Sequence, residues 1–159
     1  MNMGIRAILL AVALVLCSCV SDTRYHYFLS LPEKGWGWQD TIVFSLPADT
    51  ETGWGNLMVE LRATRRFFYT GMWIGVQQMD SVTNLLHTDT LCISMADSLG
   101  WLDGRGQNLL EYTSSSVELF CDSDKTCRQV RLYHLMSQET IGGLTDIGLR
   151  IYGGRAASQ

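Results

Sequence analysis

The residue with the most distinctive chemistry in this sequence is Cys19, which follows a short amino-terminal signal. Arg6 gives the chain a positive start, residues 7–16 are apolar, and Ser18 is the small residue before Cys19. This order is that of a secretory signal and its cleavage site. A cysteine directly after the cut offers a thiol that accepts a diacylglycerol, and acyl chains such as palmitate then anchor the new amino terminus. We therefore predict that residues 1–18 are removed and that Cys19 is lipidated.

Two other interpretations of the amino terminus are a secreted protein that is cut nearby and a retained membrane-spanning helix. A helix needs about 20 apolar residues to cross a bilayer, whereas the run over residues 7–16 has ten. Several acyl chains on one residue hold a protein firmly at a membrane. Val20 is not the aspartate that retains such proteins in the inner membrane. We expect a lipid-anchored protein of the cell envelope, in the outer membrane, on either its periplasmic or its surface side.

The part of the chain after the signal has the length and composition of one folded domain. Removing 18 residues from 159 leaves 141, and 11 basic residues (12 less Arg6) then face 16 acidic ones, a net charge of −5. Nucleic-acid binding calls for a basic patch or stripe, so we expect no nucleic acid as a partner. The predicted boundaries are a signal over residues 1–18, a lipidated tether over 19–24 and a domain over 25–155.

Apolar and polar residues alternate along many short segments of the domain, which is typical of strands with one buried face. Leu57, Val59 and Leu61, for example, alternate with Met58 and Glu60, which places Glu60 on the solvent side. Strands are predicted over residues 25–31, 41–46, 57–62, 72–77, 90–95, 117–121, 130–134 and 146–152. Seven or eight short strands predict an all-β fold, an antiparallel two-sheet β-sandwich of jelly-roll or immunoglobulin-like type. The Gly-containing connection over residues 96–115 is the main irregular region.

Three cysteines remain in the domain, and an exported protein meets an oxidising compartment. Cys121 and Cys127 flank a polar, turn-like insert, so a hairpin disulfide between them is plausible. Their direct pairing would place Leu119 opposite Gln129, a buried face against a polar one, unless a bulge shifts the register. Two reduced loop thiols are the alternative. Cys92 is expected to be a small core or half-buried residue.

The residues that could catalyse a reaction do not form a recognisable set. No nucleophile elbow, P-loop or dinucleotide-binding motif occurs, and the three histidines, His26, His87 and His134, lie far apart in the sequence. We expect His134 to be a core or rim residue. Paired carboxylates at a fixed separation could hydrolyse glycosides. The candidates for such a pair share one loop: Asp97, Asp103 and Glu111. We predict that the protein is not an enzyme and uses no cofactor or metal.

Tryptophans offer a different kind of site, because an exposed indole ring on a β-sandwich can stack on a sugar. The candidates are Trp36, Trp38, Trp54 and Trp101. Glycan binding at the cell surface through these rings is the alternative function. Burial is the competing interpretation of the same residues, because aromatic side chains carry large apolar areas.

The motifs, taken in order, resemble a known family, the gliding-motility lipoprotein GldH family of the Bacteroidota. The matching segments are residues 31–36 (LPEKGW), 40–44 (DTIVF), 72–74 (MWI), 89–91 (DTL), 96–106 (ADSLGWLDGRG) and 141–151 (IGGLTDIGLRI). The ending over residues 141–151 is the most telling of them. The resemblance spans nearly the whole chain, including the lipoprotein signal, and departs at Trp38 and at the insert between Cys121 and Cys127.

The resemblance implies a lipoprotein of the cell envelope that is associated with the machinery of surface gliding and the linked protein-secretion apparatus. It implies no catalytic activity and supplies no ligand residues. Members of the family also resemble proteins from relatives that do not glide. We expect the protein to be an accessory or scaffold component that contacts other envelope proteins, with residues 96–115 as part of the contact surface.

Overall fold

The structure is a computed structural model that describes residues 23–47, 55–120 and 126–153. These ranges hold eleven β-strands. In chain order the strands are β1 (Thr23–Ser30), β2 (Trp36–Gly37), β3 (Ile42–Ser45), β4 (Gly55–Thr64), β5 (Gly71–Met79), β6 (Leu85–Ser94), β7 (Leu109–Thr113), β8 (Val117–Leu119), β9 (Gln129–His134), β10 (Thr140–Ile141) and β11 (Leu144–Gly153). The described part of the chain has no helix long and apolar enough to cross a membrane.

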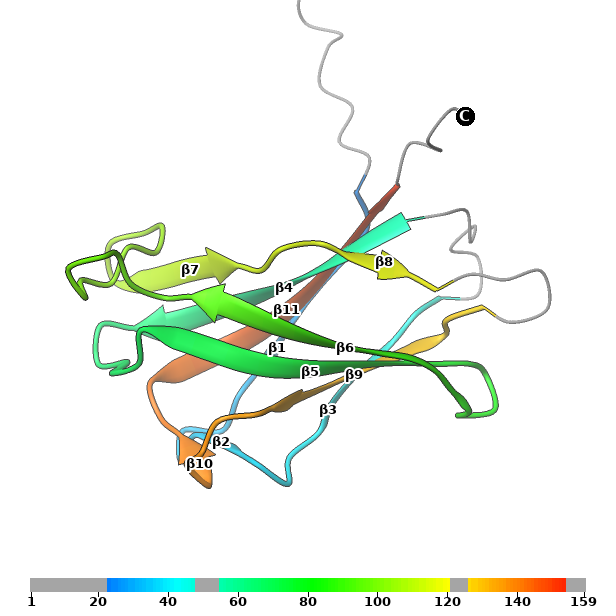
Figure 1. The fold of residues 1–159 in the computed structure, drawn as a ribbon, viewed down its shortest axis with the longest axis horizontal. Coiled ribbons are helices and arrows are strands. Elements are labelled where there is room, and N and C mark those ends of the chain that lie inside the picture. Colours follow the sequence, from blue (N-terminus) through cyan, green and yellow to red (C-terminus); the bar gives the residue numbers. More distant parts are fainter. Residues whose placement is uncertain (1–22, 48–54, 121–125, 154–159) are drawn as a thin grey trace, which may run out of the picture.

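The strands form two main antiparallel sheets that pack face to face (Figure 1). One sheet has the order β1-β11-β4-β7, with β8 also paired to β4, and the other has the order β3-β9-β5-β6. A short ribbon of β10 and β2 lies at one end. The all-β, two-sheet fold predicted from the alternation is confirmed. The number of strands is larger than predicted, because β2, β7 and β10 join the eight expected segments.

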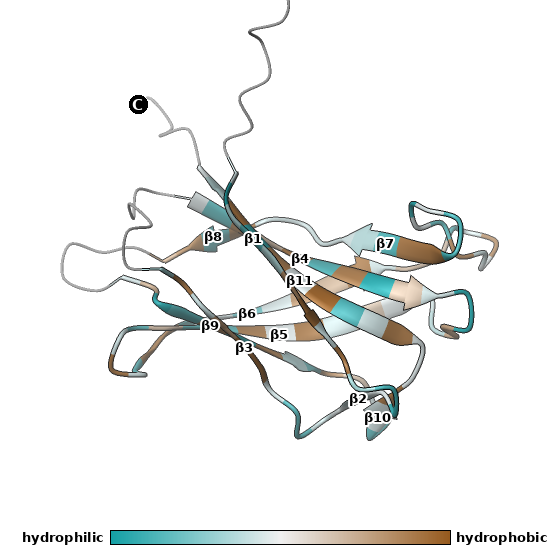
Figure 2. Ribbon diagram, turned by 180° about the vertical axis from the view of Figure 1, so that it is seen from behind, coloured by the Kyte–Doolittle hydropathy of each residue, from teal (hydrophilic) through white to brown (hydrophobic). Residues whose placement is uncertain are grey.

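The core lies between the two sheets and is built from the alternating apolar residues of the central strands. Leu57, Val59 and Leu61 of β4 are buried, as are Ile74 and Val76 of β5. Figure 2 shows the matching alternation of hydrophobic and hydrophilic residues along β4 and β11. Burial of apolar area at about 25 cal/mol per Å² is the main stabilising contribution to such a sandwich.

The three additional strands lie where local sequence signals are weakest. β2 and β10 have two residues each, and their pairing brings Trp36 beside Ile141. β7 lies inside the connection that was predicted to be irregular, and it pairs with β4. The chain enters β7 through Gly106 at φ +122°, where a Cβ would lie 2.1 Å from the Leu109 carbonyl oxygen. Only glycine fits that turn without strain.

The ends of β4 define two ends of the domain. Thr23, the first residue of β1, pairs with Tyr152 of β11, and Tyr152 pairs with Asn56 near the start of β4. The start of β1 and the end of β11 therefore lie beside the start of β4. This end of the domain is the one nearest Cys19, because Thr23 follows Cys19 by four residues. β4 runs for ten residues to Thr64, about 33 Å at the usual rise of a strand. The loop after Thr64 lies at the far end, away from the predicted lipid.

Candidate functional site

Three of the predicted site residues, Cys19, Trp54 and Cys121, lie outside the described residues. Lipidation at Cys19 stays a prediction, and so does the disulfide between Cys121 and Cys127. The hairpin that suggested this disulfide is not formed, because β8 pairs with β4 in one sheet and β9 pairs with β3 and β5 in the other. The two segments still lie close, since the Cys127 N–H donates to the Phe120 carbonyl at 3.3 Å.

The two described cysteines differ in environment. Cys127 is buried, and burial raises the pKa of its thiol to about 11. Such a thiol is protonated at neutral pH and unreactive as a nucleophile. Cys92 is exposed. The expectation of a core or half-buried Cys92 is therefore wrong, because Leu91 and Ile93 take the inner face of β6 and turn Cys92 outward.

The candidate glycan-stacking tryptophans differ in how exposed their side chains are. Trp36 is fully buried, its indole N–H donates to the Asp40 carbonyl at 2.7 Å, and its ring meets the edge of His134. A sugar cannot reach Trp36, so burial, the competing interpretation, holds for this residue. Trp38 and Trp101 are 54% and 73% exposed.

The loop carboxylates have structural partners. Asp97 Oδ1 accepts hydrogen bonds from the backbone N–H groups of Leu99 and Trp101, both at 2.9 Å, and so holds the turn between them. Glu111 forms an ion pair with Arg62 at 3.1 Å. Asp103 and Glu111 line one open hollow of about 390 Å³ that Asp97 does not reach, and two arginines, Arg105 and Arg150, share its wall. No three described His, Cys, Asp or Glu residues are placed to hold a metal ion.

Glu60 is a charged-type residue that the alternation pattern wrongly predicts to face solvent. Its side chain is fully buried, although it lies on the outer face of β4. His26 Nε2 of β1 lies 2.6 Å from Glu60 Oε2, and Arg150 Nη2 of β11 lies 2.6 Å from Oε1. The first contact has the geometry of a hydrogen bond, whereas the second is an ion pair without hydrogen-bond alignment. We call His26, Glu60 and Arg150 the Glu60 cluster.

A layer of side chains covers Glu60 on the solvent side, whereas His26 and Arg150 remain partly exposed. Gly148 of β11 pairs with both Phe28 and Glu60, and a Cβ at this glycine would lie 2.6 Å from the Phe28 ring. Phe28 therefore folds across Gly148. The Arg62 guanidinium stacks on the Phe28 ring at 3.8 Å from its centroid. A sealed carboxylate bound by two basic groups is suited to fixing β1, β4 and β11 together rather than to reacting with a ligand.

His134 is also buried, as its place on an apolar face suggests. Burial lowers its pKa below the usual 6.5, and the Trp36 backbone, the Asp40 charge and the Glu139 backbone oppose this only in part. Neither ring nitrogen has a hydrogen-bond partner of good geometry among the described residues. The folded protein therefore favours the neutral form of His134.

Stability should consequently fall at acid pH through His134. Because the unfolded chain binds a proton near pH 6.5 and the folded chain does so only at lower pH, the free energy of unfolding decreases as the pH falls from 6.5 towards the folded pKa. We expect urea midpoints between pH 7 and pH 5 to fall less for His134→Leu than for wild type. Equal decreases in the two proteins would contradict this assignment.

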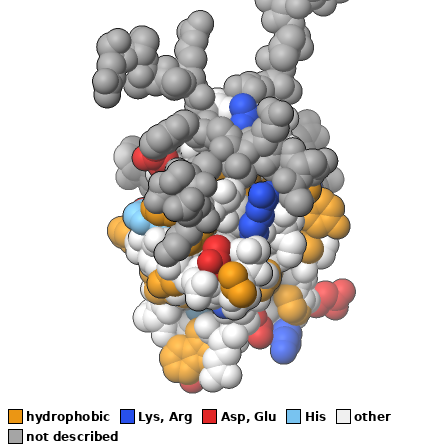
Figure 3. All heavy atoms as spheres, turned by 90° about the vertical axis from the view of Figure 1, so that its right-hand side faces the viewer, with side chains coloured by type: hydrophobic (Ala, Val, Ile, Leu, Met, Phe, Trp, Pro, Cys, Tyr) orange, Lys and Arg blue, Asp and Glu red, His pale blue; other side chains and the backbone are white. Residues whose placement is uncertain are grey.

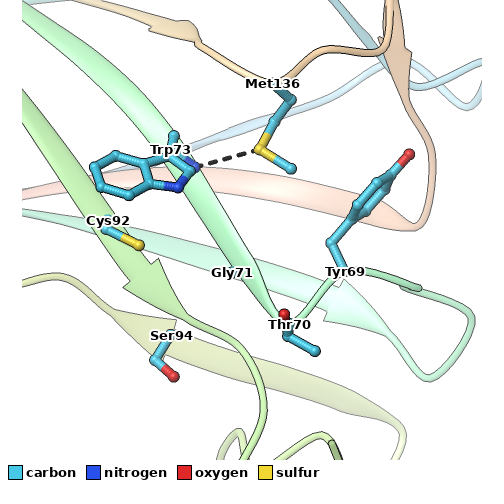
Figure 4. A pocket seen from close by; sticks show the side chains of 7 residues that line it. All are labelled: Tyr69, Thr70, Gly71, Trp73, Cys92, Ser94 and Met136. Carbon is cyan, nitrogen blue, oxygen red and sulfur yellow. Dashed lines mark hydrogen bonds between the residues drawn. The ribbon is translucent and has the colours of Figure 1, made fainter.

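A shallow hollow lies on the outer face of the second sheet, around Trp73 (Figure 4). Its volume is about 410 Å³. Trp73 of β5 pairs with Cys92 of β6, and the Trp73 backbone N–H donates to Met136 Sδ at 3.5 Å. No charged residue lines the hollow, whose walls are Tyr69, Thr70, Gly71, Trp73, Cys92, Ser94 and Met136. It can accept an uncharged ligand against an aromatic wall. Trp73 was not among the predicted tryptophans.

Comparison with protein families gives a match over residues 23–151, from the first residue of β1 into β11, to the family described as GldH lipoprotein. This range is 129 of the 159 residues. The chain belongs to the GldH lipoprotein family. The resemblance predicted from the motifs is confirmed. In this GldH lipoprotein the most telling motif, residues 141–151, runs from the last residue of β10 through most of β11. The motif over residues 96–106 lies in the loop before β7.

The comparisons add no activity to this GldH lipoprotein. No curated protein matches its sequence. Among solved structures, a fructofuranosidase from Schwanniomyces occidentalis complexed with fructose is 10% identical, with a TM-score of 0.39 over 80% of this chain and 34% of that chain. The tomato aspermy virus structure is 9% identical, with a TM-score of 0.34 over 99% and 98%. The chain thus spans about a third of the fructofuranosidase, and neither likeness is close enough to support an argument.

Proposed function

We propose that this GldH lipoprotein is an accessory or scaffold component of the gliding-motility machinery and the linked protein-secretion machinery of the cell envelope. It is held in the outer membrane by lipid on Cys19 and acts by binding other envelope proteins. The observation that supports this most is the family match over residues 23–151, which begins only four residues after Cys19. Family membership supports the lipid anchor, and the short connection would keep the domain at the membrane.

The contacts made by the polar residues also favour a binding role over catalysis. Glu60, Asp97 and Glu111 are each engaged by neighbouring groups that hold strands or turns. His134 is buried, with its ring against that of Trp36. These are the environments of structural residues, whereas a catalytic group must reach a substrate.

The surface best placed for a partner is the far end of the domain. Phe68, Leu99 and Trp101 are all largely exposed there. They come from the loop after β4 and the loop after β6, which meet because the Met95 N–H donates to the Thr70 carbonyl. On the face shown in Figure 3, by contrast, hydrophobic side chains are scattered among charged and uncharged ones. Exposed aromatic side chains are frequent anchors of protein interfaces.

The proposal is tested by purifying the full-length, tagged protein from detergent-solubilised membranes. We expect envelope proteins of the gliding or secretion machinery to co-purify. The double variant Leu99→Ser, Trp101→Ser should reduce their recovery about tenfold, the effect of losing roughly 1.4 kcal/mol of binding energy. Val82→Ser is the matched control, because Val82 is equally exposed in the β5–β6 turn. Recovery of no envelope protein would contradict the proposal, and recovery of a polysaccharide alone would favour glycan binding.

A further inference from the structure

One side of the sandwich is open between two edge strands. Among the described strands, β1 pairs only with β11, and β3 pairs only with β9. Each of these strands is thus the last in its sheet, and both lie on the same side of the molecule (Figure 2). An edge strand has a row of backbone N–H and C=O groups that are free to pair with another strand.

The core-facing side of β1 is only partly covered, because Tyr25 and Leu29 pack against the core whereas Tyr27 is exposed. Tyr25, Tyr27 and Leu29 alternate with outward-facing His26 and Phe28, so they point to the inner face. Their partners in β11 are Ile151, Leu149 and Ile147, all essentially buried. Tyr27 is nevertheless 56% exposed. The opposing edge strand β3 has only four residues, and it leaves the middle of β1 uncovered.

A hollow of about 370 Å³ follows from this arrangement. It is lined by Tyr25, Tyr27 and Leu29 of β1 and by Val43, Phe44 and Ser45 of β3. None of these six side chains carries a charge at neutral pH, and Phe44 forms part of the buried core. The hollow is therefore continuous with the core of the sandwich.

The shape and chemistry of this open side match an extended polypeptide. A strand that pairs with the free edge of β1 would satisfy its backbone groups, and alternate side chains of that strand would point into the hollow. A small molecule would use the hollow but not the row of backbone groups. β1 is also held firmly in place, because His26 is bound to Glu60 and Phe28 lies under Arg62. A fixed edge binds a strand with little loss of entropy in the receptor.

We propose that an extended segment of another envelope protein binds here, adding as a strand to β1 and inserting alternate apolar side chains between β1 and β3. This proposal rests on the proposed function and specifies that the partner protein binds through an extended segment. A second copy of this chain fits less well. Antiparallel β1 strands of two copies would place their anchored ends about 26 Å apart. Residues 19–22 span at most about 14 Å, so such a pair would have to lie flat on the membrane.

The first test places the photo-reactive amino acid p-benzoylphenylalanine at position 27 in the full-length protein, in the native cells. Its aromatic side chain resembles the tyrosine that it replaces. We expect irradiation to link position 27 to one short segment of a different envelope protein, with apolar residues at alternate positions. The same amino acid at position 82, in the β5–β6 turn, is the control. Links only to lipid, only to a second copy, or no more links than at position 82 would overturn the proposal.

The second test uses a synthetic peptide copying the segment cross-linked in the first, together with the same peptide methylated on alternate backbone nitrogens. We expect the unmodified peptide to slow amide hydrogen exchange in residues 23–30 at least tenfold, and the methylated peptide to have no effect. Tyr27→Lys should weaken binding of the peptide at least tenfold, whereas Val82→Lys, at an exposed position in the β5–β6 turn, should not. Equal binding of the two peptides would overturn strand addition.

The experiments distinguish failure of the strand-addition proposal from failure of the proposed function. If envelope proteins still co-purify through Leu99 and Trp101 while position 27 forms no such link, only the strand-addition proposal is wrong. If no envelope protein co-purifies and position 27 also forms no protein link, the proposed function fails with it.

Discussion

Replacing Arg150 by Leu should destabilise the domain by about 3 kcal/mol, the largest effect expected of any change at a partly exposed position. The substitution removes the group that lies 2.6 Å from Oε1 of the fully buried Glu60. A buried carboxylate left without its basic partner typically costs about 3–5 kcal/mol. The lower value applies here because His26 still binds the other oxygen. Urea unfolding of the detergent-solubilised protein, followed by tryptophan fluorescence, measures the change.

The double variant Glu60→Leu, Arg150→Leu tests whether Arg150 stabilises the domain through its ion pair with Glu60. Replacing both members of a buried ion pair by apolar residues is often neutral, so most of the lost stability should return. Arg66→Leu is the control for losing a surface arginine, and it should change the free energy of unfolding by less than about 0.5 kcal/mol. A double variant as unstable as Arg150→Leu would mean that Arg150 acts through packing of its stem and not through Glu60.

Eight of the eleven described strands could be predicted from the sequence because each of them carries its own alternation. Leu57, Val59 and Leu61 are buried as the pattern indicates, and Ile147 and Leu149 likewise. Local alternation says which residues share a face of one strand. It does not say what lies above that face, and this is where the predictions failed.

Glu60 illustrates that limit. It alternates with apolar residues and so was placed in solvent, but His26, Phe28 and Arg150 cover it from two other strands. These residues are 32 or more positions away in the sequence, and only the strand order brings them together. Trp36 is similar, because its burial follows from the two-residue pairing of β2 with β10. The open side between β1 and β3 also depends on strand order and has no local signal.

Replacing Cys19 by Ala should have the largest effect on location. Cys19 is the predicted acceptor of the lipid, and the described domain has no helix able to cross a membrane in its place. Several acyl chains together hold a protein at a membrane, whereas one chain binds only marginally. The Cys19→Ala protein should therefore leave the membrane fraction almost completely while keeping its fold, because the described domain begins after the substituted residue.

The most direct test of this account separates membranes from soluble envelope contents after a high-salt wash, and compares wild type, Cys19→Ala and Cys17→Ala. Cys17 is the matched control, because it is a thiol two residues earlier, inside the predicted signal. We predict wild type and Cys17→Ala in the membrane pellet and Cys19→Ala in the soluble fraction with an unchanged β-sheet circular dichroism spectrum. A Cys19→Ala protein that stays in the washed membranes would contradict the lipid anchor.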